Sequence, residues 1–281
     1  MTLVEPALES KLHDLEQRLA DLRRVIVAFS GGVDSSFLAE VAHRVLGSDS
    51  LAVTADSPSL ARRDLASARE LAAARGWNHR VVETNEVHRA DYARNAPDRC
   101  YWCKTELFEV LAPLARDLDS QVVVGTNLDD LGDYRPGLKA ARRHEAATPL
   151  ADARLTKDEI RALSAREGLP TAPRPASPCL ASRVSYGIEV TPERLARIEA
   201  AEDLLASLGF DVLRVRDHGD LARIEVPAER IPELIGHREL IERRLEALGW
   251  SYVSLDLGGF RAGSMNRVLA APRLGGSRGS A

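Results

Sequence analysis

The sequence predicts an α/β fold in which a doubly wound parallel sheet is followed by a smaller α+β domain. Over the first part of the chain, short apolar runs alternate with segments of helical periodicity, which is typical of a parallel sheet covered by helices on both faces. Over the last third, the pattern changes to helix, strand, strand, helix, strand, as in a small α+β sandwich. The length of 281 residues allows about two domains, each with its own core.

The first domain is expected to open with an amphipathic helix. Leucines recur at helical spacing between Leu8 and Leu22, and two heptads favour packing on the same domain over a coiled-coil seam. The next apolar run ends in two glycines before a helical segment, which predicts a strand, a tight turn and a helix. The expected strands are residues 25–29, 51–55, 80–83 and 122–125, and the expected helices are residues 33–46, 59–75, 104–118 and 150–170.

A proline-rich segment separates the two predicted domains. Residues 173–179 contain three prolines and can form neither a helix nor a central strand, so we expect a fixed loop there. Just before it, Thr156 and Glu159 have the spacing of a capping box. The second domain is expected to contain a helix from Thr191, strands at residues 211–216, 221–226 and 252–257, and a helical segment at residues 227–248. The expected domains are therefore residues 1–185 and 186–272, with a disordered tail at 273–281.

Charge and composition exclude several classes of protein. Lys and Arg number 38 and Asp and Glu number 42, which gives a net charge of −4 with the signs mixed along the chain. Strong attraction to nucleic acid or membranes is therefore not expected. There is no apolar run long enough for a bilayer span, and the first residues carry acids where a secretory signal needs positive charge. We expect a cytoplasmic protein that acts on a small molecule, with a second domain that binds substrate and supports a homo-oligomer.

The strongest local signal for chemistry is SGGVDSS, residues 30–36, directly after the first strand and at the start of a helix. Its two glycines allow the backbone to approach a ligand closely, while free N–H groups and the helix dipole favour an anion. Its serines add hydroxyl donors, so the segment is predicted to hold phosphate, with Asp34 placed to bind Mg²⁺. The simpler alternative is a glycine-rich turn capped by Asp34 or Ser35.

The same segment resembles the pyrophosphate loop of the ATP pyrophosphatases, the superfamily of NAD synthetases, GMP synthetases, asparagine synthetases and tRNA thiolases. The resemblance implies an adenine nucleotide α-hydrolase-like fold for the first domain. It also implies that ATP is cleaved to AMP and pyrophosphate, and that AMP is placed on a substrate oxygen so that a nucleophile can displace it. The loop thus indicates how a substrate is activated but leaves the nucleophile open.

The three cysteines of the chain suggest what the nucleophile is. Cys100 and Cys103 form a CxxC pair at a helix start, and Cys179 lies 76 residues after Cys103 in the proline-rich loop. An odd number of cysteines without an export signal favours thiol or metal chemistry over disulfides. All three lie in polar or proline-rich segments, so they could share an iron–sulfur cluster with one open iron, or supply three of the four ligands of zinc. Unconnected thiols are the alternative.

The wider pattern is more specific than either motif. Four segments together resemble the ATP-dependent sulfur transferases that build the nickel-pincer cofactor of lactate racemase. They are RCYWCK from Arg99, GTNLDDLGDYRPGLKA from Gly125, PASPCLASRV from Pro175 and RVRDHGDLARIEV from Arg214. The resemblance covers almost the whole chain, about residues 25–257. It implies that both carboxylates of pyridinium-3,5-biscarboxylic acid mononucleotide are adenylated and converted to thiocarboxylates.

The resemblance leaves two sources for the sulfur. One branch of the family has only the cysteine that matches Cys179, and it gives up that sulfur and leaves dehydroalanine. Another branch has three cysteines, which match Cys100, Cys103 and Cys179, and is thought to bind a [4Fe-4S] cluster that supplies sulfide. This sequence has the three-cysteine pattern. The cofactors implied are therefore ATP, Mg²⁺ and an iron–sulfur cluster.

Polar residues after the fourth expected strand fit the same chemistry, because open α/β sheets bind ligands at the carboxyl ends of their strands. Asp129 and Asp130 could cap the loop there, or contact Mg²⁺ or the ribose. Arg135, Lys104 and Arg183 are expected to supply positive charge near the phosphates, although a solvated surface position explains each equally. The expected ATP contacts are Ser30, Gly31, Gly32, Asp34, Ser35, Ser36, Asp56, Thr126, Asp129, Lys104 and Arg183.

The second domain offers candidates for binding the substrate. Arg214 and Arg216 alternate along one strand face, so both point the same way and could hold a mononucleotide phosphate. An exposed strand face is the alternative. Glu225 and Glu199 are candidates for further Mg²⁺ ligands, with a surface position at least as well supported.

The sequence thus predicts an ATP-dependent sulfur transferase with Asp34, Cys100, Cys103 and Cys179 as its catalytic residues. A tRNA thiolase also joins a pyrophosphate loop to cysteines, but it needs a broad basic surface that the scattered charges do not provide. A non-catalytic ATP-binding or zinc-binding regulator with structural cysteines is a third possibility. An amide-forming synthetase is weaker, because the sequence shows no glutaminase domain or second set of catalytic motifs.

Overall fold

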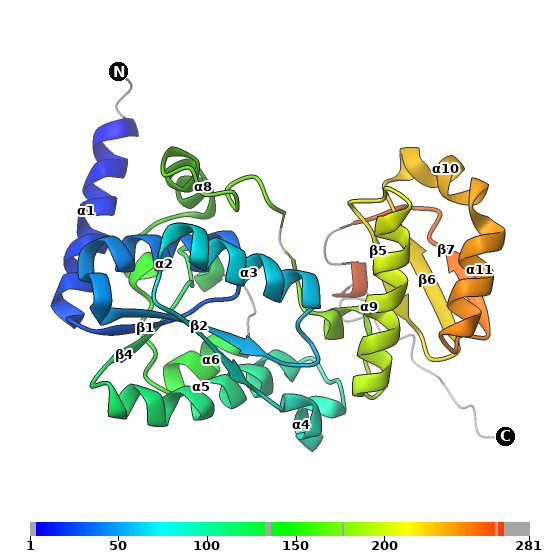
Figure 1. Cartoon of the computed structure of the whole chain (residues 1–281), viewed down its shortest axis with the longest axis horizontal. Coiled ribbons are helices and arrows are strands. Elements are labelled where there is room, and N and C mark those ends of the chain that lie inside the picture. Colours follow the sequence, from blue (N-terminus) through cyan, green and yellow to red (C-terminus); the bar gives the residue numbers. More distant parts are fainter. Residues whose placement is uncertain (1–3, 133–135, 176, 262–263, 267–281) are drawn as a thin grey trace, which may run out of the picture. The chain divides into compact units, whose positions relative to one another are not determined.

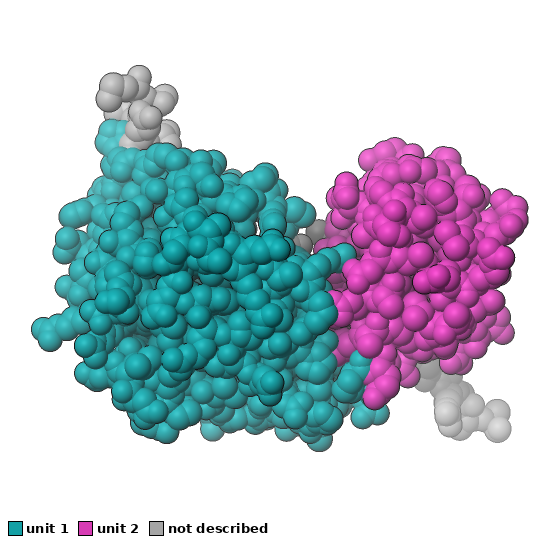
Figure 2. All heavy atoms as spheres, in the orientation of Figure 1, with its two compact units in different colours: residues 1–179, 189–192 teal, residues 180–188, 193–281 magenta. Residues whose placement is uncertain are grey.

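The computed structural model describes residues 4–132, 136–175, 177–261 and 264–266. Within these ranges the chain forms two compact units, which Figure 2 colours separately. Unit 1 comprises Met1–Cys179 and Glu189–Pro192, and unit 2 comprises Leu180–Ile188 and Glu193–Ala281. Residues 180–185, which we expected in the first domain, thus group with unit 2. Arg135 and the expected tail at residues 273–281 lie outside the described residues.

Unit 1 is built on a four-stranded parallel sheet, which confirms the predicted fold class. Its strands are β1 (Val25–Ala28), β2 (Ser50–Asp56), β3 (His79–Glu83) and β4 (Gln121–Val124). Their order is β3-β2-β1-β4 (Figure 1), with Val27 of β1 opposite Ala52 on one side and Val123 on the other. The chain moves outward from β1 to β3 and then crosses back to place β4 beside β1. The winding therefore reverses between β1 and β4, and open α/β sheets bind ligands at such a point.

Helices cover both faces of this sheet (Figure 1), because alternate residues of a strand point to opposite sides. Val27 lies in the apolar cluster under α1, α2, α3 and α8, whereas Ile26 lies in the cluster under α5 and α6. Leu15 of α1 is fully buried in the first cluster, which confirms that this helix packs on its own domain. The helices are α1 (Val4–Leu22), α2 (Val33–Leu46), α3 (Arg62–Arg75), α4 (Ala90–Ala93), α5 (Arg99–Asp117), α6 (Pro136–Arg143), α7 (Pro149–Asp152) and α8 (Lys157–Arg166).

Two of the expected helices are divided, and α6 was not expected. The expected helix over residues 150–170 is interrupted because Arg154 adopts a left-handed φ of 56° and Thr156 then begins a new helix. Thr156 Oγ1 accepts a hydrogen bond from the N–H of Glu159, and the Glu159 carboxylate accepts one from the N–H of Thr156. The capping box is therefore confirmed, and it marks the start of α8 rather than the interior of a longer helix.

Unit 2 is a small α+β layer, as the sequence predicts. Its three strands lie in the order β5-β6-β7, with β5 and β6 antiparallel and β6 and β7 parallel. The apolar face of these strands is buried together with helices, among them α10 and α11. These two helices take the place of the single helical segment expected at residues 227–248, which is divided at Gly236. The elements are α9 (Pro192–Ser207), β5 (Arg214–Asp217), β6 (Leu221–Glu225), α10 (Ile231–Gly236), α11 (Arg238–Ala247) and β7 (Tyr252–Leu255). Among the described residues, no helix is long and apolar enough to cross a membrane.

Candidate active site

The glycine-rich loop lies between the end of β1 and the start of α2. Gly31 has a left-handed φ of 76°, and a Cβ there would also touch the Cβ of Ala68 at 3.5 Å, so the position suits glycine. Gly32 is the N-cap of α2 and has no side chain to bond the first N–H groups of the helix. No side-chain cap therefore satisfies these N–H groups, and binding of an anion there stays a prediction.

Two serines hold the loop in shape. Ser35 Oγ donates to the carbonyl of Gly32 at 3.1 Å and accepts from the N–H of Ser30 at 3.2 Å. The hydroxyls of Ser30 and Ser35 are also 3.1 Å apart. Ser36 is fully buried, and its hydroxyl has no hydrogen-bond partner within the described part of the chain. The loop is therefore organised before any ligand binds, with one buried hydroxyl unsatisfied.

The end of β4 packs directly on this loop. A Cβ on Gly125 would lie 2.8 Å from the backbone nitrogen of Ser35, closer than real Cβ atoms come to other atoms. Only a glycine allows this approach. The next residues, Thr126 and Asn127, are buried, and Asn127 Nδ2 donates to Asp34 Oδ1 at 3.3 Å. The carboxyl ends of β1 and β4 thus form one site, at the point where the winding of the sheet reverses.

Asp34 is paired with a lysine that the sequence analysis did not single out. Lys157 Nζ lies 2.5 Å from Asp34 Oδ2, and both side chains are partly exposed. Lys157 is the first residue of α8, and its N–H donates to Asp129 at 2.8 Å. A cation in the first turn of a helix opposes the helix dipole. That conflict, together with the capping box that sets where α8 starts, is the sequence signal that could have identified Lys157.

The other expected ATP contacts in unit 1 have local partners. Asp130 and Asn127 bond reciprocally through side chain and backbone, which makes Asp130 a cap of the loop after β4. Asp56, at the end of β2, pairs with Arg62 at 2.6 Å. Lys104 lies in α5 beside Gly137, where a Cβ would meet its Cγ at 3.2 Å. Contact of these residues and of Asp129 with ATP or Mg²⁺ stays a prediction.

The three cysteines come together in unit 1. Helix α5 begins at Arg99, five residues before the expected start, so Cys100 and Cys103 lie in its first turns, three residues apart. Burial raises the pKa of the Cys103 thiol, and the charges of Glu86 and Cys179 raise it further. Burial also raises the pKa of Cys100, with Cys179 as the next cause. The charge of Cys179 contributes to both shifts, so Cys179 lies within electrostatic range of the CxxC pair, although 76 residues of sequence separate it from Cys103.

Two buried polar groups adjoin the cysteines, and the sequence analysis missed both. Glu86 is 1% exposed and accepts a 2.6 Å hydrogen bond from Ser59, and its charge acts on Cys103. Tyr92 of α4 is also 1% exposed, and burial raises its pKa, followed by the charges of Cys179 and Cys103. The Tyr92 hydroxyl has no hydrogen-bond partner among the described residues. A buried donor left unpaired costs free energy, so the cysteine site has capacity for a polar ligand.

The donor set fits an iron–sulfur cluster by its chemistry. Thiolates are the ligands that hold such clusters, and three of them leave one iron open. Over the described residues, no group of three or more His, Cys, Asp or Glu side chains is arranged to hold a metal ion. Ligands of a cluster bind separate irons and need not converge on a single point. Assignment of the cysteines to a [4Fe-4S] cluster therefore stays a prediction.

Helix α3 links the cysteine loop to the phosphate loop. Ser177, two residues before Cys179, donates to the Asp64 carboxylate at 3.1 Å. The carbonyl of the same Asp64 lies 3.9 Å from the Cβ position of Gly31. Asp64, in the first turn of α3, thus bonds to the cysteine segment and lies near Gly31 of the phosphate loop. The segment that carries Cys179 is therefore anchored beside the loop that is predicted to bind the phosphates of ATP.

The expected sites in unit 2 are engaged in buried ion pairs. Arg183 is 2% exposed and pairs with Glu202 at 3.0 Å. Arg216 pairs with the fully buried Glu225 at 2.7 Å, and Glu225 also accepts from Arg223 and Ser264. Arg214 is only partly buried and lies over the ring of Phe260, 5.2 Å from its centre. The structure thus shows what these side chains contact within unit 2, and their roles toward ATP, Mg²⁺ or substrate stay predictions.

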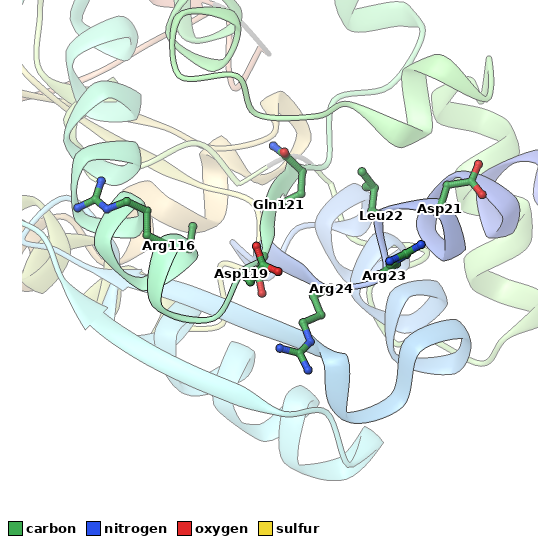
Figure 3. A pocket seen from close by; sticks show the side chains of 9 residues that line it. Asp21, Leu22, Arg23, Arg24, Arg116, Asp119 and Gln121 are labelled. Atoms are coloured by element: carbon green, nitrogen blue, oxygen red, sulfur yellow. The ribbon is translucent and has the colours of Figure 1, made fainter.

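A polar hollow of about 840 Å³ lies at the opposite end of the strands (Figure 3). Arg23 and Arg24 before β1 and Gln121 at the start of β4 contribute to its lining. Arg116 and Asp119, from the end of α5 and the turn after it, complete the charged groups on the other side of the hollow. The phosphate loop follows the carboxyl end of β1, so this hollow lies at the amino ends of the strands, away from the phosphate loop.

Known proteins resemble this chain over part or nearly all of its length. The asparagine synthase family profile matches residues 9–114. A relative from Lactiplantibacillus plantarum, described as pyridinium-3,5-bisthiocarboxylic acid mononucleotide synthase, is 39% identical over 95% of this chain and 98% of its own length. An uncharacterized protein of Synechocystis is 45% identical over 93% of this chain and 99% of its own length. A tRNA-specific 2-thiouridylase of Acidiphilium cryptum is 32% identical but covers 55% of this chain and 56% of its own length.

The fold and the phosphate loop define an ATP-dependent enzyme of the ATP pyrophosphatase superfamily. Within it, the chain belongs to the family of pyridinium-3,5-bisthiocarboxylic acid mononucleotide synthase, since the similarity extends over nearly all of both chains.

Proposed function

We propose that this enzyme uses ATP to replace oxygen by sulfur in the two carboxylates of pyridinium-3,5-biscarboxylic acid mononucleotide. The observation that carries the proposal is that Cys100, Cys103 and Cys179 belong to the same unit as the phosphate loop, with Cys179 in electrostatic range of the other two thiols. The 39% identity to a synthase of the bisthiocarboxylic acid mononucleotide supports the choice of substrate. A carboxylate supplies the oxygen to be activated, and a thiol site supplies the sulfur.

The first half of the reaction takes place at the phosphate loop. A substrate carboxylate oxygen attacks the α-phosphorus of ATP, a bond to AMP forms, and pyrophosphate leaves. The N–H groups at the start of α2 and the hydroxyls of Ser35 and Ser36 hold the phosphates. Asp34 would hold Mg²⁺, which would neutralise the negative charge of the phosphates. Lys157, which pairs with Asp34 before ATP binds, then turns to the departing pyrophosphate.

The second half takes place at the cysteines. A sulfur nucleophile attacks the acyl carbon, the carbon–sulfur bond forms, and AMP leaves with the electron pair of the carbon–oxygen bond. A [4Fe-4S] cluster held by Cys100, Cys103 and Cys179 would supply that sulfur as a hydrosulfide on its open iron, without consuming a cysteine. The buried Tyr92 hydroxyl, which has no hydrogen-bond partner among the described residues, would donate a hydrogen bond to the sulfur or the acyl oxygen. In the alternative, the Cys179 thiolate attacks directly and AMP leaves, which gives a thioester. Loss of the Cys179 α-proton and cleavage of its Cβ–S bond then release the thiocarboxylate and leave dehydroalanine at position 179.

We further propose that Arg214 and Arg216 hold the phosphate of the substrate. Charge-assisted bonds to phosphate contribute on the order of 2 kcal/mol, so Arg214→Ala should raise the KM of the mononucleotide by more than tenfold and leave that of ATP near the parent value. Arg216→Ala also breaks the ion pair with buried Glu225, so its unfolding free energy must be measured alongside. Equal increases of both KM values in Arg214→Ala would place Arg214 at the ATP site instead.

The experiment that tests the function supplies ATP, Mg²⁺, a sulfide source and the biscarboxylate mononucleotide to the anaerobically reconstituted enzyme. Mass spectrometry should then show products in which one and then two oxygens are replaced by sulfur, with AMP and pyrophosphate formed alongside. Asp14→Ala is a suitable control, because Asp14 is exposed and bonds only to Arg18 of its own helix in the described contacts. Pyrophosphate formation without any sulfur-containing product would contradict the proposal.

A further inference from the structure

The segment that carries Cys179 has little capacity to hold itself in place. Residues 173, 175 and 178 are prolines, which have no N–H to donate, and the described side chains between 173 and 178 are exposed. The N–H of Arg174 donates to the carbonyl of Thr171 at 3.1 Å, whereas the carbonyl oxygens of the segment need donors from elsewhere. Proline also restricts the backbone, so a small number of contacts is enough to define the path of the segment.

Arg161 provides two of these donors. From α8, its Nη1 donates to the carbonyl of Ala172 at 2.5 Å and its Nη2 donates to the carbonyl of Arg174 at 2.9 Å. The rigid fork of a guanidinium fixes the two carbonyls relative to each other, which a single ammonium cannot do. Further along, Ser177 is anchored to Asp64 of α3. Cys179 follows Ser177 by two residues. Both anchors therefore hold the part of the chain that leads to the thiol.

The helix that carries Arg161 also reaches the phosphate loop. Lys157 lies four residues earlier on the same face of α8 and contacts Asp34. The helix is fixed by its capping box and by Ile160 and Leu163, which are buried in the core of unit 1. One rigid helix therefore sets the positions of the phosphate-loop carboxylate and of the cysteine segment.

We propose that Arg161 is a positioning residue for sulfur transfer, which places Cys179 by holding the carbonyls of Ala172 and Arg174. The proposal rests on the proposed function, because it takes Cys179 as part of the site that delivers sulfur. Arg161 itself contacts neither the phosphate loop nor the CxxC pair in the hydrogen bonds described for it. Its loss should therefore leave activation of the substrate intact and impair the delivery of sulfur to it.

The test compares Arg161→Ala and Arg161→Lys with Arg166→Ala in the full chain. Arg166 is a matched control, because it lies in the same helix and its side chain pairs with the exposed Glu9. Activation is measured as isotope exchange between ATP and pyrophosphate in the presence of the biscarboxylate mononucleotide. Delivery is measured as thiocarboxylate formed per chain. The order of the segment is measured by hydrogen exchange over residues 171–179 and by the alkylation rate of Cys179, read peptide by peptide.

Arg161→Ala should keep the isotope exchange of the parent and form thiocarboxylate about 10- to 100-fold more slowly, the scale expected for a reacting group misplaced by ~1 Å. Hydrogen exchange over residues 171–179 should become faster. Arg161→Lys should fall between the parent and Arg161→Ala, because one ammonium can replace only part of the fork. Arg166→Ala should match the parent in every measurement.

Parent-like sulfur transfer and hydrogen exchange in Arg161→Ala would overturn the proposal. An equal loss of isotope exchange and sulfur transfer would also overturn it, since Arg161 would then support the fold or the ATP site. A parent enzyme that exchanges pyrophosphate but forms no thiocarboxylate contradicts the proposed function rather than this inference. Hydrogen exchange still tests the anchor in that case: faster exchange over residues 171–179 in Arg161→Ala shows that Arg161 holds the segment, and unchanged exchange refutes that.

Discussion

The phosphate loop and the cysteine segment are built in opposite ways. The phosphate loop, residues 30–36, is closed by its own serines and glycines and is short, local and largely satisfied by its own hydrogen bonds. The cysteine segment, residues 173–179, is proline-rich, its described side chains before Cys179 are exposed, and distant residues such as Arg161 and Asp64 hold it. A site that binds a common ligand can be encoded locally. A site that must bring sulfur to an activated carbon depends on the tertiary structure around it.

The largest expected effect comes from the carboxylate of the phosphate loop. Asp34→Ala should abolish ATP cleavage, with a loss of several kcal/mol in the transition state, because a positioned metal or phosphate contact is removed. The fold should survive, since Asp34 is partly exposed at the edge of the sheet. Pyrophosphate release in the presence of substrate measures the effect, and circular dichroism checks the fold. A variant that forms pyrophosphate at the parent rate would remove Asp34 from the mechanism.

An intermediate effect is expected where β4 meets the loop. Gly125→Ala places a Cβ 2.8 Å from the nitrogen of Ser35, so the loop or the strand must move. Overpacking of this kind costs about 1–3 kcal/mol of stability, and the displaced loop should bind ATP more weakly. Denaturant unfolding and the KM of ATP measure the two effects. Gly236→Ala is the control, because a Cβ there meets nothing within 4 Å, and equal behaviour of the two variants would contradict the close approach.

The smallest expected effect concerns the start of α8, the helix whose side chains contact both the phosphate loop and the cysteine segment. Burial opposes the charge of Glu159, but hydrogen bonds from Lys11 and Thr156 outweigh it and hold the pKa of this carboxyl below its usual value. The stability that this lowered pKa provides is present above the unfolded pKa and is lost as pH falls through the folded one. Glu159→Gln keeps an oxygen for the cap but loses the charge, and should cost about 0.5 kcal/mol near pH 7.

The pH dependence of that difference is the measurement. Thermal or denaturant unfolding of the parent and of Glu159→Gln between pH 7 and pH 3 should converge as Glu159 becomes protonated in the parent. A stability difference that stays constant over this range would mean that the charge of Glu159 plays no part. The pair Lys11 and Glu159 would then be an ion pair without energetic consequence, as many partly exposed pairs are.

The fold and the phosphate loop could be predicted from the sequence because both depend on local patterns. Alternating apolar runs predict the parallel sheet, and Gly31 and Gly32 between a strand and a helix predict the anion site. Lys157 could not be placed in this way, since its partner Asp34 is 123 residues away and only the fold brings them together. The break before α8 was also missed, because the left-handed conformation of Arg154 is uncommon for a residue of that type.

The buried ion pairs of unit 2 mark another limit of sequence reasoning. Alternation along β5 places Arg214 and Arg216 on one face, but the two differ in burial. The partner of Arg216 is Glu225, on the adjacent antiparallel strand and directly opposite Arg214 in register. A sequence pattern gives the face of a strand, whereas the register and the layer above it decide which charges are buried together.

The central claim is that Cys100, Cys103 and Cys179 form one site that delivers sulfur to the ATP-activated substrate. The most direct test is the number of thiocarboxylates formed per chain by the anaerobically reconstituted enzyme and its three single Cys→Ala variants, with the mass of the Cys179 peptide after turnover. We predict bound iron and sulfide in the parent, their decrease in every variant, more than one thiocarboxylate per chain, and an intact Cys179. A single thiocarboxylate per chain, dehydroalanine at position 179 and unimpaired Cys100→Ala and Cys103→Ala variants would contradict the shared site.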